Sequence, residues 1–169
     1  QVRAQYAAFE SGLTNPASEV YLHEMPGGQF TNLKAQARAM GLEERWAEVA
    51  HAYAEANMIF GDIVKVTPSS KVVGDMALMM VSQNLSRKDV EDPSTEVAFP
   101  ESVVDMMKGN LGQPEGGWPV GISQKVLKGE PSNTKRPGAG VPSADIAAIR
   151  AKVMADLKIG TEENEDESL

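Results

Sequence analysis

The sequence predicts an all-α protein built as an irregular set of helices. Ala and Met are plentiful, with 9 Met in 169 residues, and both enter helices at little entropic cost, whereas aromatic residues make up only 5%. Apolar residues recur at helical spacing in several segments that Gly and Pro separate, and no convincing sheet pattern appears. Some of the apolar helix faces are expected to need partners that lie outside this chain.

Charge and composition exclude several classes of function. The formal net charge of -8 argues against nucleic-acid binding, because neutralising phosphates requires clustered Lys and Arg. The chain has no cysteine and therefore neither disulfides nor thiolate metal sites, and a cytoplasmic location is expected. No apolar run approaches the roughly 20 residues of a membrane span. We expect no metal site: His23 is predicted to make a local turn contact, and His51 to lie at a helix edge.

The N-terminal segment is predicted to contain one helix and one extended stretch. Residues 2–9 place their apolar side chains on one helical face, and Gly12 can end this helix. Such a beginning is typical of a helix already under way, so the chain is expected to be an internal segment of a longer protein. Residues 19–25 are predicted to be extended, and the Pro-Gly-Gly at residues 26–28 is predicted to break regular structure.

Two helices are predicted next, on either side of a glycine. Thr31 is a natural N-cap for a helix over residues 32–40, which Gly41 ends. The clearest helix of the chain covers residues 42–60, and Gly61 ends it. Its apolar stripe follows helical spacing through Leu42, Trp46, Val49, Tyr53, Ala56 and Phe60.

A third long helix is predicted over residues 69–83. Thr67 is expected to be its N-cap, and Pro68 its first helical residue. Its apolar face consists of side chains that we interpret as core residues, namely Val72, Val73, Met76, Met79 and Met80. The side chains expected to join this helix to the preceding one are Trp46, Tyr53, Val72 and Met76.

The rest of the chain is predicted to hold short helices, a linker and a final helix. The short helices are expected near Arg87 and over residues 101–108 and 122–127. Residues 128–142 are rich in Pro and Gly and are predicted to be extended and poorly packed. The final helix, residues 144–158, has Ile146, Ile149, Val153 and Leu157 on one face. The acidic residues beyond Gly160 are expected to lack a stable partner.

The segment GDIVKVTPSSKVVGD, residues 61–75, holds the most suggestive polar cluster. A helix N-terminus offers unpaired N–H groups and positive partial charge, so hydroxyls gathered there can help to bind a carboxylate or a polar acyl group. The alternative is structural, with Thr67 as a plain N-cap. The cluster consists of Thr67, Ser69 and Ser70 between Lys65 and Lys71.

Long stretches of the chain resemble biotin-dependent pyruvate carboxylases, in the region that follows the catalytic barrel. The resemblance rests on EVYLHEMPGGQFTNLKAQARAMGL, residues 19–42, and GDIVKVTPSSKVVGDMALMMV, residues 61–81. It continues through FPESVVDMMKGNLGQPEGGWP, LKGEP and RPG, to about residue 158. Oxaloacetate decarboxylases and transcarboxylases share the PGG and VTP elements, whereas the longer KVTPSSKVVGD is typical of pyruvate carboxylases.

The resemblance implies a place in an enzyme that transfers CO₂ from carboxybiotin to pyruvate and so forms oxaloacetate. These helices would form a funnel over the mouth of a TIM barrel, where the chemistry of barrel enzymes takes place. The barrel with its divalent metal, the ATP-dependent domain, the biotin carrier and most of an allosteric domain would lie outside this chain. The intact enzyme would be a homotetramer.

The resemblance also assigns roles to three residues. Thr67 matches the threonine that moves a proton between pyruvate and biotin, and Ser70 and Lys71 match residues beside the biotin ring. A hydroxyl suits this role because it both donates and accepts a proton without building charge. No metal ligand is assigned to this chain.

The resemblance divides the chain into three parts. Residues 1–128 would be the C-terminal helical part of the carboxyltransferase domain, residues 129–142 a linker, and residues 143–169 the start of the allosteric and tetramerisation region. Two alternatives remain: a carboxyltransferase segment of an oxaloacetate decarboxylase or transcarboxylase, or a purely structural helical scaffold that makes subunit contacts. The isolated chain is expected to have no activity.

Overall fold

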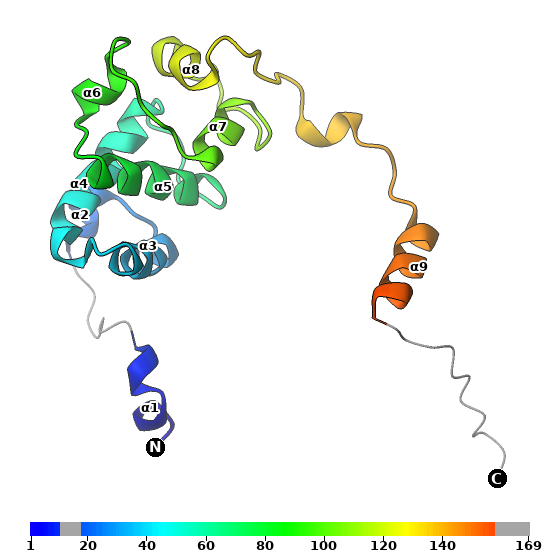
Figure 1. The fold of residues 1–169 in the computed structure, drawn as a ribbon, viewed down its shortest axis with the longest axis horizontal. Coiled ribbons are helices and arrows are strands. Elements are labelled where there is room, and N and C mark those ends of the chain that lie inside the picture. The colour runs from blue at the N-terminus through cyan, green and yellow to red at the C-terminus, as the bar shows by residue number, and fades with distance from the viewer. Residues whose placement is uncertain (11–17, 158–169) are drawn as a thin grey trace. The chain divides into compact units, whose positions relative to one another are not determined.

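The computed structural model of the chain is helical throughout the residues that it describes, 1–10 and 18–157 (Figure 1). Within these ranges no strand forms, and one isolated bridge joins Asn110 to Gly112. The predicted all-α class is therefore confirmed. The chain forms two compact units, Gln1–Pro137 and Gly138–Leu169. The α-helices are α1 (Val2–Gln5), α2 (Val20–His23), α3 (Gly27–Ala39), α4 (Trp46–Ile59), α5 (Ser69–Ser82), α6 (Arg87–Glu91), α7 (Glu101–Met107), α8 (Val120–Leu127) and α9 (Ile146–Asp156), and 3₁₀ helices cover Ala7–Phe9, Glu43–Arg45 and Pro137–Gly140.

The core of the first unit lies between α4 and α5, the most extensive contact of the structure. Both predicted apolar faces are buried there, and Gly61 follows the end of α4 with a left-handed backbone (φ 93). Trp46 is the exception in its stripe, because it is only partly buried and packs edge-on against Phe30 of α3, with ring centroids 5.2 Å apart. The fully buried side chains of this contact include Val49, Tyr53, Val72, Val73 and Met76.

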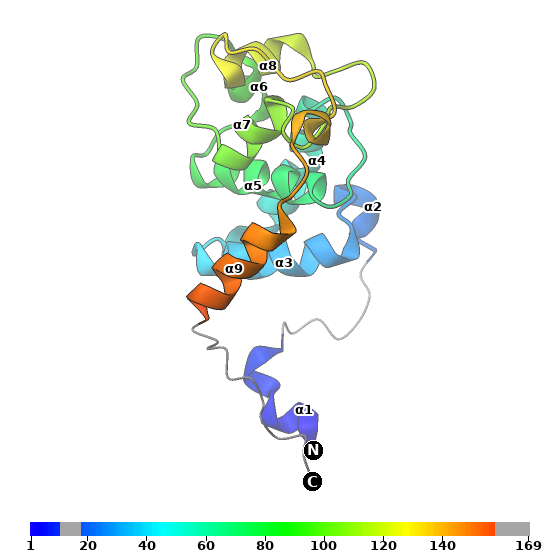
Figure 2. The same ribbon diagram turned by 90° about the vertical axis from the view of Figure 1, so that its right-hand side faces the viewer.

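Further helices pack around this pair (Figures 1 and 2). Helices α2 and α6 pack on α4, α3 and α7 pack on α5, and α8 packs on α7. The predicted short helices are confirmed as α6, α7 and α8. Methionine is prominent in this core, since Met79 and Met80 of α5 and Met106 and Met107 of α7 are all buried in it.

Residues 19–25 are not extended as predicted, since α2 forms one helical turn there. No described strand pairs with this segment, so its backbone groups bond within the turn, as when the Glu24 N–H donates to the Val20 carbonyl at 2.7 Å. Glu24 then ends the turn with a left-handed backbone (φ 56). Gly12, the predicted end of the first helix, lies outside the described residues.

The Pro-Gly-Gly at residues 26–28 starts a helix and does not break one. Pro26 is the N-cap of α3, and its carbonyl accepts the Phe30 N–H at 2.9 Å. First-turn N–H groups need no partner inside the helix, so Pro at this boundary costs no hydrogen bond. Thr31 is therefore inside α3 and is not its N-cap; its hydroxyl donates to the Gly28 carbonyl at 3.0 Å. Gly41 ends α3 as predicted, with φ 72.

The predicted linker is mostly exposed over residues 128–142, but it is not free of contacts. The prediction of poor packing is wrong for Ser132 and Asn133, which hydrogen-bond to the end of α7. In the second unit the final helix is shorter than predicted and begins at Ile146, with Asp145 as its N-cap. The acidic residues beyond Gly160 lie outside the described residues.

Candidate functional site

A cavity of about 420 Å³ lies beside the start of α5. One wall comes from the connection between α4 and α5, with Val64, Thr67 and Ser69. The opposite wall comes from the loop between α7 and α8, with Gln113 and Trp118. Most of the lining is apolar, and the polar side chains in it are Thr67, Ser69, Gln113 and Glu115. A mostly apolar lining with a few polar groups is typical of small-molecule sites.

Thr67 lines this cavity and is exposed, and it does not cap α5 as predicted. The helix begins at Ser69. If Thr67 were the N-cap, its hydroxyl would accept the Ser70 N–H, but this N–H donates to the Val66 carbonyl at 3.1 Å. The side-chain hydrogen bonds of this helix start come from Ser69, whose Oγ accepts the Val66 N–H at 3.1 Å and donates to the Val66 carbonyl at 2.6 Å. The hydroxyl of Thr67 is thus not required for the helix start.

Ser70 and Lys71 sit on the first turn of α5 but outside the cavity lining. Ser70 is buried, and its carbonyl accepts the hydroxyl of Tyr53 at 3.3 Å. Burial raises the pKa of Tyr53 to about 12, so this phenol stays protonated as a donor at neutral pH. Lys71 is exposed and pairs with Asp75 one turn further on, at 2.6 Å. Asp75 also accepts the hydroxyl of Ser102 in α7 at 2.6 Å.

The loop between α7 and α8 is the part of this site that the sequence analysis missed. Gly112, Gly116 and Gly117 all have positive φ, as tight turns require. The indole N–H of Trp118 is buried and has no hydrogen-bond partner among the described residues. The glycine-rich sequence signals a tight loop, but it does not reveal that the loop lies opposite Thr67.

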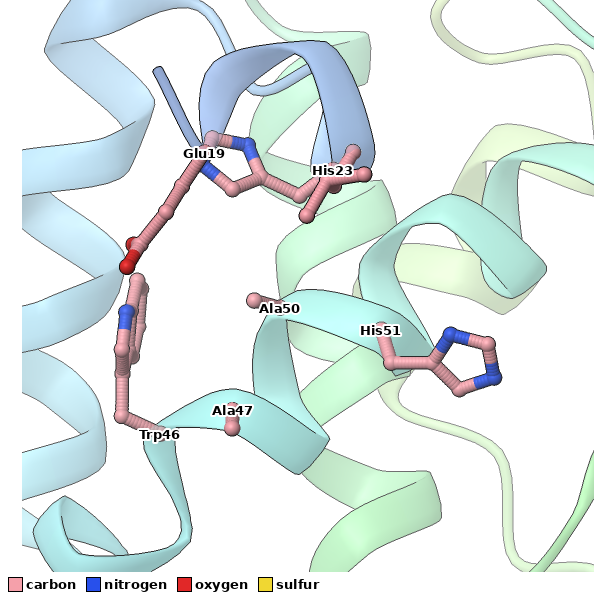
Figure 3. Close-up of a pocket in the computed structure, with 7 residues that line it drawn as sticks. Glu19, His23, Trp46, Ala47, Ala50 and His51 are labelled. Carbon is pink, nitrogen blue, oxygen red and sulfur yellow. The ribbon is translucent and has the colours of Figure 1, made fainter. Parts of the chain in front are cut away.

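A second pocket, of about 380 Å³, contains both histidines (Figure 3). His23 is buried, stacks on Phe30 with ring centroids 5.3 Å apart, and accepts the Met25 N–H on Nδ1 at 2.9 Å. The predicted local turn contact is therefore confirmed. Burial lowers the pKa of His23, which keeps the ring neutral. The ring of His51 points away from His23 and Trp46, and His51 is exposed, as expected for a helix edge (Figure 3).

Lys65, the first lysine of the predicted cluster, is held away from free solvent. Its side chain is only 14% exposed, and Nζ lies 2.9 Å from a carboxylate oxygen of Glu24. This ion pair ties the connection before Thr67 to the end of α2. Among residues 1–10 and 18–157, no group of three or more His, Asp or Glu side chains is arranged to hold a metal ion, and no helix is long and apolar enough to cross a membrane.

Comparison with known proteins identifies the class to which this fold and site belong. Residues 20–169 match the family model described as a conserved carboxylase domain, and the chain belongs to this family. The related proteins are pyruvate carboxylases. The Bacillus subtilis enzyme is 52% identical over 149 residues and the Schizosaccharomyces pombe enzyme 52% identical over 151 residues. These alignments cover 88% and 89% of the chain but only 13% of each relative.

Solved structures agree with the sequence relatives. The carboxyl transferase domain of Rhizobium etli pyruvate carboxylase, solved with pyruvate and biocytin, has 66% sequence identity and a TM-score of 0.88. The match covers 93% of this chain and 26% of that domain. The complete multifunctional pyruvate carboxylase from the same organism gives a TM-score of 0.87, and the chain covers 15% of its length. The resemblance to pyruvate carboxylases is therefore confirmed.

Proposed function

We propose that this chain is part of the carboxyltransferase of a biotin-dependent pyruvate carboxylase, which moves CO₂ from carboxybiotin to pyruvate and forms oxaloacetate. The observation that carries the proposal is the 66% identity, over 93% of the chain, with a carboxyl transferase domain solved with pyruvate and biocytin. The chain represents 26% of that domain, so we expect pyruvate, the divalent metal and ATP to bind elsewhere in the full-length enzyme.

Thr67 is the residue that we propose as the proton relay. Carboxylation of pyruvate breaks a C–H bond of its methyl group, and the ring nitrogen of biotin gains a proton as its CO₂ leaves. The Thr67 hydroxyl can accept the first proton and donate its own, so no net charge builds up on the protein. The support for this role is that Thr67 lines a cavity and that Ser69, and not Thr67, stabilises the start of α5.

Ser70 and Lys71 are proposed to lie beside the biotin ring. Both belong to the first turn of α5, adjacent to Thr67. The cavity beside Thr67, of about 420 Å³, is large enough for a bicyclic urea, and Ser70 and Lys71 follow Thr67 on the first turn of α5 without lining this cavity. When bound, carboxybiotin supplies the CO₂. Lys71 can meet a polar ring with its ammonium group, because its pairing with Asp75 lies at the surface, where Lys71 is 59% exposed.

The isolated chain is expected to be inactive, in line with its share of the domain. We further propose that residues 1–128 belong to the carboxyltransferase, that residues 129–142 form a linker, and that residues 143–169 begin an allosteric and tetramerisation region.

Purified chain incubated with oxaloacetate and free biotin should release no pyruvate above background. Measurable decarboxylation would show that the chain carries a complete active site.

The test of Thr67 uses three variants of the full-length enzyme: Thr67→Ala, Thr67→Ser and Thr67→Val. Ala and Val should lower pyruvate carboxylation by about 10²-fold or more, a typical loss for a positioned proton-transfer group. Ser keeps a hydroxyl and should retain part of the activity. Bicarbonate-dependent ATP cleavage, which takes place at another centre, should stay near normal in all three variants.

Thr31→Val is the matched control, because Thr31 is an exposed threonine inside α3, away from the cavity lining. This variant should carboxylate pyruvate at close to the normal rate. A correctly folded Thr67→Val enzyme with near-normal carboxylation would remove the proton-relay role. Melting temperatures measured for all variants separate loss of chemistry from loss of fold.

A further inference from the structure

The cavity wall opposite Thr67 is a loop with few local constraints. Residues 108–119 connect α7 to α8, and Gly109, Gly112 and Gly116 within them adopt positive φ. Local backbone hydrogen bonds close only small turns, such as Gly112 N–H to the Gly109 carbonyl at 3.0 Å. A glycine-rich backbone loses more conformational entropy on ordering than other sequences do. The loop therefore needs contacts with residues outside it to keep a single conformation.

Gln113, in the middle of the loop, makes such a contact. Its side chain lines the cavity, and its amide nitrogen lies 2.5 Å from the Ser132 hydroxyl and 3.0 Å from the Asn133 carbonyl. The amide carries two N–H donors, so it can serve both acceptors at once. Gln113 therefore joins the cavity wall to a segment nearly twenty positions further along the chain.

The segment that receives Gln113 is itself anchored. The Ser132 hydroxyl donates to the Met107 carbonyl at 2.8 Å, and the Asn133 N–H donates to the Lys108 carbonyl at 2.8 Å. These are carbonyls at the C-terminal end of α7, which lack partners inside the helix. An ion pair between Lys108 and Glu130, at 2.7 Å, supports the same contact. Ser132 and Asn133 are thus fixed to the end of α7, and the hydrogen bonds of Gln113 to these two residues hold the loop.

We propose that Gln113 is a positioning residue for the site at Thr67, acting through Ser132 and Asn133 to hold the cavity wall against which the biotin ring lies. The proposal rests on the proposed function, because the occupant of the cavity is taken to be the biotin ring. Gln113 acts on binding and not on proton transfer. Loosening the wall should weaken biotin binding while leaving the chemistry of the bound complex largely unchanged.

The kinetic test uses full-length enzyme prepared without its attached biotin, with free biotin as the probe and biotin-dependent oxaloacetate decarboxylation as the reaction. Gln113→Ala removes two hydrogen bonds and should raise KM for biotin roughly 3- to 30-fold, with kcat within about twofold of normal. Ser132→Ala should shift KM in the same direction. The double variant should lose less than the product of the two single effects, because both residues act in one network.

Gln124→Ala is the matched control, since Gln124 is an exposed glutamine of α8 outside the cavity lining, and it should leave KM unchanged. A second measurement is amide hydrogen exchange of residues 109–118, which should become faster in Gln113→Ala and Ser132→Ala but not in Gln124→Ala. An unchanged KM in Gln113→Ala, in an enzyme that Thr67→Val inactivates, would overturn the positioning role alone. Full activity of Thr67→Val would instead overturn the proton-relay role of Thr67, and the absence of biotin-dependent decarboxylation by the unmodified full-length enzyme would overturn the proposed function.

Discussion

At the scale of single residues, the two histidines show how environment decides protonation. His23 is buried, with 3% of its surface exposed, and its Nδ1 accepts a backbone N–H, which assigns the ring proton to Nε2. The nitrogen Nε2 is buried without a partner among the described residues. A second proton on this ring would have to displace the Met25 N–H and charge a buried group. His51, in contrast, is exposed at the surface.

Stability should therefore fall with acid through His23. Burial lowers the folded-state pKa of His23 below its usual value of 6.5, so the unfolded chain binds the proton first as pH falls. The contribution of the neutral His23 ring to the free energy of unfolding is complete above about pH 6.5, and it is lost as the pH decreases through the folded-state pKa. Melting temperature between pH 7.5 and 5 should decline in the unmodified chain and in His51→Gln, and less steeply in His23→Gln. Three parallel profiles would contradict this linkage.

Residue-level inference from the sequence succeeded where contacts are local. The turn contact of His23 involves Met25, two positions away, and was predictable. The capping role of Thr67 was predicted wrongly, because the pattern Thr-Pro-Ser-Ser allows more than one helix start and the hydroxyl of Ser69 bonds back to Val66. The role of Gln113 was not predictable, since its partners lie nearly twenty positions away.

At the scale of elements, a glycine allows the end of α7 and the segment after α8 to lie in close contact. Gly109 has φ 81, and an added Cβ there would collide with the Asn133 carbonyl oxygen. A side chain at this position would thus meet two obstacles, an unfavourable backbone conformation and a backbone atom that cannot rotate away. Close approach of two backbones is the reason that glycine is required here.

Gly109→Ala should destabilise the chain more than the replacement of a glycine that is required only for its backbone conformation. Gly41→Ala is the matched comparison, because Gly41 has φ 72 and open space around its Cβ position. Gly41→Ala should cost about 1–2 kcal/mol, and Gly109→Ala a further ~1–3 kcal/mol for the steric conflict. Urea unfolding of both variants measures the difference. Equal losses would mean that the segment at Asn133 moves aside freely.

Sequence patterns predicted the long elements better than their boundaries. The stripe from Leu42 to Phe60 has many repeats of one period, and α4 with the preceding 3₁₀ turn follows it closely. Pro26, with the two glycines after it, was predicted to break regular structure, although its position before a first turn makes it a suitable helix start. Breaker residues act differently at helix ends and in helix interiors, and one sequence does not say which applies.

At the scale of the whole molecule, all buried apolar residues of the described chain belong to the first unit. Both walls of the cavity beside Thr67 come from this unit, and they meet because α7 packs on α5. Such a long-range meeting of loops cannot be predicted from periodicity. The second unit, Gly138–Leu169, has no buried residue in its described part, and each apolar side chain predicted to form a face of its helix is exposed.

Deleting residues 138–169 should leave the melting temperature of the remaining chain within about 2 °C of the original value. The reason is that no described side chain of the second unit contributes to the core, and each kcal/mol lost would shift melting by roughly 4–8 °C in a small domain or 2–4 °C in a larger one. Thermal unfolding followed by circular dichroism is sufficient for the comparison. A drop of 5 °C or more would show that the second unit stabilises the first.

The bare apolar side of α9 has a consequence for how that helix forms. Its 11 residues are fewer than the roughly 12–15 at which an isolated helix becomes even marginal in water, because nucleation is costly and few residues follow to repay it. The N-cap at Asp145 offsets only part of this deficit. Because propensity alone gives so short a helix little stability, any contact that covers Ile149 and Val153 would raise the helicity of this segment.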